Sequence, residues 1–287
     1  MLLQIPVPIG PGIECKVGVF DSIIGYESVE SPSNPNYTRS YGHSIEPQTH
    51  TGILASCRVV PALKLSFGIA NTMGPSINAR AFGEDGKAES AKTYMGSVEL
   101  TAPDSLGFMA GSTLYGGVVT GLNENESRSD YDRNSSSYYA GFTLATPVVG
   151  LRAGGSLDVL DVANTSGETW AVAGYLSYMF PDSKLSVHGR AEYLRDRGAQ
   201  KFFTTDATTP FSSTNPDRVL ALTGTVQYDL WKNVISRLEV RWDHSLSGER
   251  SWGPTTTAPG PFGVITGPEH GTLKNEVMVA ANIIYRF

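Results

Sequence analysis

Apolar and polar residues alternate over stretches of about ten residues along the whole chain, and this alternation restricts the possible folds more than any other feature. Successive side chains of a strand point to opposite faces, so each such stretch has one apolar and one polar face. No apolar run of about 18 residues is present, which excludes a transmembrane helix. We predict strands over 13–20, 49–59, 63–71, 91–102, 106–118, 136–146, 149–161, 168–180, 184–196, 217–230, 234–246 and 274–287.

The connections between these predicted strands alternate between short and long. The short ones are 60–62, 103–105, 147–148, 181–183 and 231–233. The long ones are 21–48, 72–90, 119–135, 162–167, 197–216 and 247–273. Outer-membrane barrels have tight periplasmic turns and longer external loops, and a periplasmic C-terminus gives every connection its expected length. We therefore predict an all-β fold, a transmembrane antiparallel up-and-down β-barrel with about twelve visible strands, forming one domain over 1–287.

Charged residues fall on one face of three neighbouring predicted strands, 184–196, 217–230 and 234–246. A charge on the lipid face costs roughly 2–4 kcal/mol near the midplane, so the charged face is predicted to line a water-filled pore. The predicted pore-lining residues are Arg58, Lys64, Glu99, Arg152, Asp158, His188, Arg190, Glu192, Arg237, Glu239, Arg241, Asp243, Glu276 and Arg286.

Cationic and anionic side chains are balanced on this inward face once Lys16, Glu14 and Asp229 are added. The balance predicts weak ion selectivity, and pairing of neighbouring charges to stiffen the sheet is an equal alternative. The formal net charge of -6 then belongs mainly to the loops. An acidic chain without a basic stripe also argues against nucleic acid as a partner.

The 21–48 connection is long, rich in Pro and Tyr, and contains Asp21, Glu27, Glu30, Arg39 and Glu46. Our hypothesis is that it folds partly into the lumen and narrows it, with Arg39 opposite the carboxylates. The alternative is an external loop that packs on its neighbours.

The last predicted strand ends with Phe287, Tyr285 and Ile283 on one face. This arrangement resembles the C-terminal signal read by the outer-membrane assembly machinery, which would act by strand addition. An ordinary last strand that ends in Phe is the alternative. Cys15 and Cys57 are predicted near the periplasmic ends of neighbouring strands, where a disulfide and two small lipid-facing residues both remain open.

Three stretches carry a family resemblance: Gly18–Glu27, Glu30–Tyr41 and Ile45–Gly52. They resemble the OmpL-like β-barrel porins, the beta-barrel porin 2 group. The resemblance implies a porin-type barrel among the lipids of the outer membrane of a diderm, Gram-negative bacterium. It implies passive passage of small hydrophilic solutes and carries over no catalytic residue. Porins are often homotrimers, and an intact member is expected to have about sixteen strands, so we expect N-terminal strands to be missing here.

Two other functions were weighed against a porin. A barrel-embedded hydrolase needs a nucleophile, a base and an orienting group within hydrogen-bond reach. No G-x-S-x-G motif occurs, and His188 and His244 belong to opposite faces, so we predict no enzyme. The loop acids lack a regular ligand spacing, so no metal and no cofactor is predicted. A structural or adhesive barrel, with function in loops such as 123–133, remains the alternative that a liposome swelling assay would separate from a porin.

Overall fold

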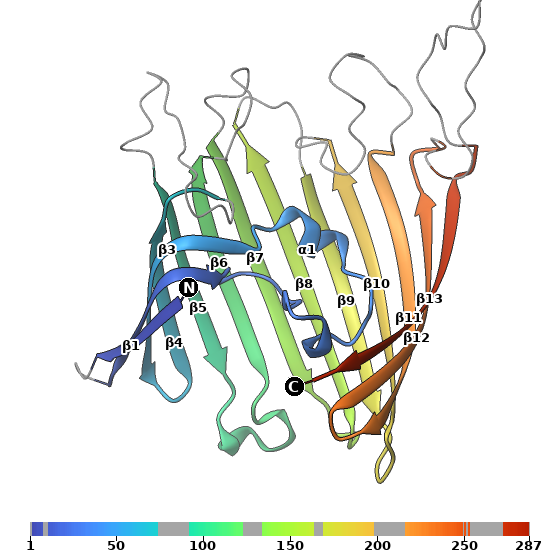
Figure 1. Ribbon diagram of the computed structural model, residues 1–287, viewed down its shortest axis with the longest axis horizontal. Coiled ribbons are helices and arrows are strands. Elements are labelled where there is room, and N and C mark those ends of the chain that lie inside the picture. Colours follow the sequence, from blue (N-terminus) through green and yellow to red (C-terminus); the bar gives the residue numbers. More distant parts are fainter. Residues whose placement is uncertain are drawn as a thin grey trace, which may run out of the picture.

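The computed structural model describes residues 2–7, 11–73, 92–122, 134–163, 169–197, 216–248, 250, 252 and 272–286. These residues form one antiparallel sheet of 13 strands that follow one another in chain order (Figure 1). Every neighbouring pair in the sheet is therefore also consecutive in the sequence. This is the up-and-down arrangement that the alternating connections predict.

The strands alternate in direction and are joined at one end by short turns. They are β1 (Leu2–Val7), β2 (Ile13–Asp21), β3 (Thr49–Val60), β4 (Leu63–Ala70), β5 (Thr93–Thr101), β6 (Thr113–Leu122), β7 (Asn134–Ala145), β8 (Leu151–Val162), β9 (Thr169–Met179), β10 (Leu185–Asp196), β11 (Arg218–Trp231), β12 (Val234–Ser245) and β13 (Asn275–Tyr285). The helices are η1 (Ser31–Ser33), α1 (Tyr41–Ile45) and η2 (Asp104–Met109). None of the helices in the described part of the chain is long and apolar enough to span a membrane.

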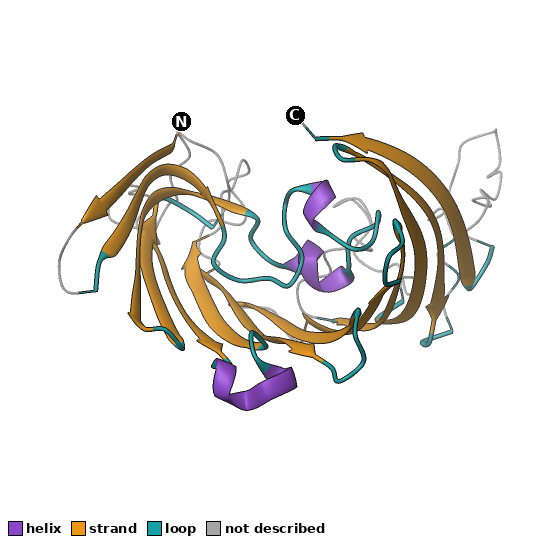
Figure 2. Cartoon of the chain, turned by 90° about the horizontal axis from the view of Figure 1, so that it is seen from below, coloured by secondary structure: helices purple, strands orange, loops and turns teal. Residues whose placement is uncertain are grey.

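The sheet curves around a concavity, as Figure 2 shows from the end of the strands. Among the described residues, β1 and β13 are the two edges and do not pair with each other. Helices η1 and α1 lie inside the concavity, whereas η2 lies outside the sheet (Figure 2). The inside of the curve is therefore not an empty space.

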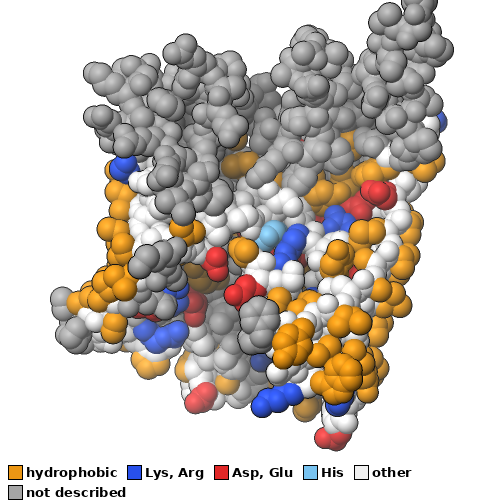
Figure 3. Space-filling model, viewed as in Figure 1, with side chains coloured by type: hydrophobic (Ala, Val, Ile, Leu, Met, Phe, Trp, Pro, Cys, Tyr) orange, Lys and Arg blue, Asp and Glu red, His pale blue; other side chains and the backbone are white. Residues whose placement is uncertain are grey.

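The two faces of the sheet differ in chemistry. On the convex face large apolar side chains are exposed, among them Phe67 (65%), Leu176 (53%) and Val279 (66%). On the concave face polar and charged side chains are buried, and Figure 3 shows charged side chains in the middle of the molecule with hydrophobic ones along both flanks. A convex surface of this composition is suited to lipid, which covers apolar side chains without a second protein layer.

The predicted strands are confirmed with three corrections. Residues Leu2–Val7, which precede the first predicted strand, form strand β1. Residues 106–112 are not strand, because Asp104–Met109 turn as a 3-10 helix with Gly107 at a φ of 59°, and β6 starts only at Thr113. Cys15 and Cys57 are free thiols, each opposite a different residue of the neighbouring strand, so the disulfide alternative is not realised.

Candidate pore and its inward segment

Residues 22–48, which join β2 to β3, are called the inward segment because they lie in the concavity (Figures 1 and 2). The segment leaves and re-enters the sheet at one point, where Ser22 N donates to Gln48 O at 2.9 Å. Side chains hold its turns: Asn34 bonds to the backbone of Ser28 and Glu30, and the Ser40 hydroxyl accepts from His43 N at 3.0 Å to cap α1.

An apolar contact fixes one side of the inward segment against the sheet. Ile23 and Ile24 are buried in a cluster with sheet residues Phe20, Leu54, Met95, Val119 and Tyr139. The Tyr115 hydroxyl donates to the carbonyl of Ile23. Burial of aliphatic side chains of this size contributes about 1.5–3 kcal/mol each, which favours a docked segment.

Two inward-facing glycines make room for this contact. A Cβ atom on Gly117 of β6 would lie 2.7 Å from Cγ2 of Ile24. A Cβ atom on Gly154 of β8 would lie 2.1 Å from the Tyr26 hydroxyl oxygen. Tyr26 stacks on Tyr175 of β9, with ring centroids 3.9 Å apart and an interplanar angle of 14°. The absence of side chains at these two glycines thus lets the inward segment pack directly against the sheet.

Charged side chains of β10 and β12 hold the other side of the inward segment. We call Arg190 and Glu192 of β10 with Arg237, Glu239, Arg241 and Asp243 of β12 the charged ladder. Its members pair with one another: Arg190 with Glu192 at 3.0 Å, Arg241 with Asp243 at 2.8 Å and Arg241 with Glu192 at 3.5 Å. Arg190 also pairs with Glu27 of the inward segment at 2.9 Å.

The backbone of the inward segment supplies further partners to the ladder. The Arg39 carbonyl accepts from Arg190 at 3.1 Å and from Arg241 at 2.7 Å. Tyr41 donates its backbone N–H to Glu192 at 2.7 Å and its hydroxyl to Asp243 at 2.8 Å. Burial, the largest cause, raises the pKa of the Tyr41 hydroxyl, so the group stays a donor.

Glu239 and Arg237, the remaining members of the charged ladder, also form hydrogen bonds with the inward segment. Glu239 accepts from the backbone N–H of Tyr37 at 2.5 Å and of Thr38 at 2.9 Å, and from the Thr225 hydroxyl at 2.7 Å. Arg237 donates to the carbonyls of Ser31 and Asn34. Buried charges are tolerated when they are paired and hydrogen-bonded, and here the inward segment supplies much of that pairing.

The other predicted pore-lining residues are in varied surroundings. Asp158 faces inward and is 2% exposed, with Gly42 of α1 against its carboxylate. The two ring nitrogens of His188 lie 2.9 Å from the Ser177 hydroxyl and 3.1 Å from that of Ser186. Arg286 donates to the Pro32 carbonyl at 2.7 Å. Arg152 and Glu276 are exposed.

The five residues predicted for the constriction occupy three environments. Glu27 and Glu46 are buried, and Asp21 and Glu30 are exposed. The Arg39 guanidinium donates to the Val29 carbonyl at 2.9 Å. The ladder arginines Arg190 and Arg241 bond to the backbone carbonyl of Arg39.

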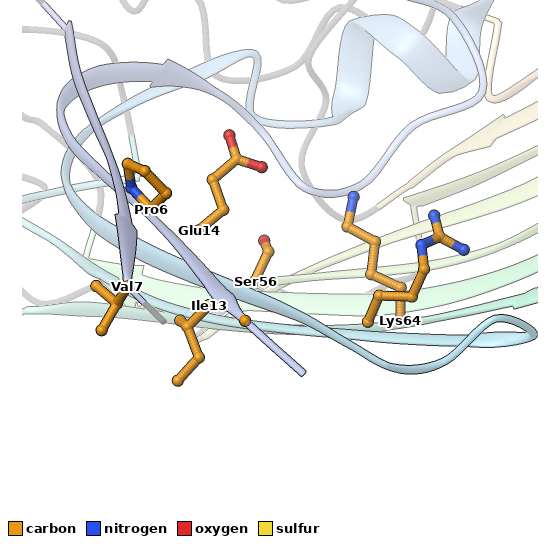
Figure 4. A pocket seen from close by; sticks show the side chains of 8 residues that line it. Pro6, Val7, Ile13, Glu14, Ser56 and Lys64 are labelled. Atoms are coloured by element: carbon orange, nitrogen blue, oxygen red, sulfur yellow. The ribbon is translucent and has the colours of Figure 1, made fainter. Parts of the chain in front are cut away.

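A pocket of about 620 Å³ lies on the concave side of β1 to β4, near the short-turn end of the strands. Arg58, Lys64, Ser56 and Glu14 line it, and Figure 4 shows Lys64, Ser56 and Glu14 on one side of the sheet with Ile13 on the other. Glu99 lies 3.7 Å from Arg58 and 3.9 Å from Lys64. The side chains of Arg58 and Lys64 remain 50% and 37% exposed, in contrast to the ladder.

Several contact residues were missed in the sequence, namely Tyr26, Asn36, Tyr37, Thr38 and Tyr41. The signal that could have indicated them is the run of Asn, Tyr and Thr between 34 and 41, whose side chains carry many hydrogen-bonding groups. In the terminal strand, Ile283 and Tyr285 are exposed on the convex face, and Phe287 lies outside the described residues.

One antiparallel up-and-down sheet with a lipid-type convex face, a charged concave face and an inward segment defines a porin-type channel of the bacterial outer membrane. The chain belongs to the family described as "Putative beta-barrel porin-2, OmpL-like", whose model matches residues 2–287. Members of this class let small solutes pass through the outer membrane. Among curated protein sequences, none matches this chain.

Solved structures with the same fold are distant in sequence. An anion-selective porin from Comamonas acidovorans has 10% identity and a TM-score of 0.59, covering 100% of this chain and 77% of that one. In-vitro folded OmpT, an outer membrane protein of Vibrio cholerae, has 12% identity and a TM-score of 0.56, covering 99% and 80%. At such identities the similarity shows the fold alone.

Proposed function

We propose that small hydrophilic solutes pass along the part of the concave side that the inward segment leaves open, past the exposed charges near the short-turn end of β2 to β5, and that the segment is the constriction. The charged ladder is an anchor for the segment in this proposal. The observation that supports it is the difference in exposure: Glu239 is 0% and Arg190 3% exposed, whereas the Arg58 side chain is 50% exposed. The ladder charges are paired with opposite charges and covered by the inward segment, so ions that cross the pore meet mainly the exposed charges.

Deletion of residues 28–44 tests the constriction. The deletion removes the parts that bond to β10 and β12, so single-channel conductance in planar bilayers should rise several-fold. Heat-modifiable migration, which reports a folded barrel, is the control for assembly. Unchanged conductance in a folded variant would exclude the segment as the constriction.

Weak ion selectivity follows from the charges that remain exposed. Arg58 and Lys64 share the pocket region with Glu14 and Glu99, so cations and anions are balanced there. A reversal potential near zero in a salt gradient is the expected measurement. Liposome swelling tests the function as a whole: entry of sugars supports a porin, and no entry by a folded, inserted protein would favour the structural or adhesive barrel.

The channel is proposed to have no catalytic activity. A hydrolase base needs one ring nitrogen on the nucleophile and the other on an orienting group. Both nitrogens of His188 face serine hydroxyls, which supplies two candidate nucleophiles and no orienting carboxylate. Absence of hydrolysis of ester and peptide substrates by the reconstituted channel is the expected result.

Assembly is proposed to follow the porin pattern, as one domain over 1–287, with recognition of the terminal strand by the assembly machinery and with three copies in the membrane. Alternating exposed Ile283 and Tyr285 support recognition by strand addition. Substitution of Phe287 and Tyr285 by Ala should lower the folded fraction in cells. Cross-linking in the membrane that stops at dimers, or that yields none, would contradict the trimer.

A further inference from the structure

Of the helices in the described residues, only η2, which joins β5 to β6, lies outside the sheet (Figure 2). Its apolar side chains are exposed: Leu106 to 52% and Phe108 to 59%. The positive φ of Gly107 turns the chain between these two residues. Within 102–112 only Asp104 is charged. Helix η2 is therefore an apolar projection from the convex side of the sheet.

Hydrogen bonds hold η2 in a defined position. Within it, Leu106 N donates to the Pro103 carbonyl at 3.0 Å. At its end, the Ser112 hydroxyl accepts from Ala145 N at 3.0 Å, which ties the segment to the end of β7. Backbone groups that are bonded within the protein do not need water as a partner, so such a segment can enter a lipid interface at low cost.

The neighbouring turn at the same end of the sheet, between β7 and β8, is also apolar. Val148 and Val149 are exposed, the latter to 79%, and no charged residue occurs within 146–150. Two other short turns differ, because exposed Asp182 follows β9 and exposed Lys232 follows β11. Helix η2 and the β7–β8 turn together thus present an apolar surface at an end of the sheet where other turns carry charge.

This surface continues the lipid-facing side of the sheet. Leu100 of β5 is opposite Leu114 of β6, which is opposite Phe142 of β7, and all three side chains are exposed on the convex face. Helix η2 follows this row on the same side of the sheet (Figures 1 and 2). The lipid that covers the row therefore also meets η2 where the strands end. Short amphipathic segments in this position bury their apolar side chains about 5–10 Å into the boundary between headgroups and acyl chains.

We propose that Leu106, Phe108 and Val149 insert into the membrane leaflet at the short-turn end of the barrel, at the boundary between phospholipid headgroups and acyl chains. The surface then anchors β5 to β8 at a fixed height in the membrane. Lipid fits this surface better than a second copy of the chain does. A second copy would need a smooth convex face to pack against, and η2 projects from that face (Figure 2).

The test uses the full chain with Cys15 and Cys57 replaced by Ser and with one new cysteine that carries an environment-sensitive fluorophore. F108C and V149C report on the proposed surface, and D182C, on the charged turn after β9, is the matched control. In vesicles of phosphatidylcholine and phosphatidylglycerol, the labels at 108 and 149 should lose most of their fluorescence to a lipid with a nitroxide near its headgroup. They should be shielded from acrylamide present on both sides of the membrane, and the label at 182 should show the reverse.

Three results would overturn the proposal. Quenching by acrylamide at 108 and 149 as strong as at 182 would mean that the surface meets water. Protection from both quenchers would mean that another protein surface, such as a second copy, covers η2. Stronger quenching by a nitroxide at the end of the acyl chain would contradict a position at the headgroup boundary.

Folding of each labelled variant is checked by heat-modifiable migration. L106C gives the same reading as F108C if the latter does not fold. The test measures no conductance, so its failure would leave the proposed channel function untouched, and a channel that failed to conduct would leave this proposal standing.

Discussion

Glu27 of the inward segment and Arg190 of β10 form an ion pair at 2.9 Å, and their side chains are 1% and 0% exposed. Arg190 bonds in addition to Glu192 and to the carbonyls of Thr38 and Arg39. Removal of one partner of a buried pair leaves an uncompensated charge, which costs about 3–5 kcal/mol. This arginine is accordingly the main electrostatic link between segment and sheet.

Arg190→Met should release the inward segment from β10. We expect higher single-channel conductance and protease cleavage within 22–48, because Glu27 and Glu192 lose their shared cation. Lys184→Met, on a periplasmic turn, is the control and should change neither property. E27Q combined with R190M should recover part of the lost stability, and an unchanged double variant would argue against direct coupling.

Gly154→Val should displace Tyr26 from its stack on Tyr175. The first added atom would lie 2.1 Å from the Tyr26 hydroxyl oxygen, so the ring must move. The movement is measured by fluorescence quenching of Tyr26 or by its accessibility to iodination, together with conductance. Gly174→Val is matched to it, because Gly174 is on the neighbouring strand with open space around it. Equal effects of the two substitutions would contradict a specific role for Gly154.

Charge reversal in the pocket should change ion selectivity more than charge removal in the ladder. R58E/K64E puts negative charge on two half-exposed positions and should shift the reversal potential towards cation preference. Arg237→Gln, beneath the inward segment, should leave the reversal potential near that of the native channel if the segment stays docked. A larger shift of the reversal potential in Arg237→Gln than in R58E/K64E would instead place the conduction path along β12.

Acidic pH should loosen the inward segment through His43. Burial, the largest cause, lowers the pKa of this imidazole, although the charge of Glu27 partly offsets it. A histidine with a lowered pKa in the docked state stabilises that state above about pH 6.5, the usual value, and this contribution is lost as the pH falls below it. Conductance recorded between pH 7.5 and 5 should rise, and H43Q should flatten the profile. H244Q, on the convex face, should retain the pH dependence of the native channel.

The strands and their faces were predictable because both depend on a local period of two residues. Two errors have local causes as well. Strand β1 is short and contains Pro6, which is tolerated since β1 is an edge strand. Residues Leu106 and Phe108 alternate as a strand would, but they belong to a turn that the positive φ of Gly107 permits.

The covering of the charged ladder was not predictable from the sequence. Alternation places Arg190 and Asp243 on the concave face, but it contains no information on what lies above them. Their partners Glu27 and Tyr41 are 163 and 202 positions away in the chain. Pairing over such distances depends on the curvature of the complete sheet, and no local pattern encodes that curvature.

These long separations also order the events of assembly. The inward segment emerges early, between β2 and β3, yet its anchors on β10 to β12 are among the last strands to be made. Contacts of such high contact order form late, after the intervening chain is in place. Until then the charges of the ladder are exposed to water on the uncovered concave face of the sheet. The constricted channel therefore forms in the last step of folding. A chain arrested before that step would have the highest conductance.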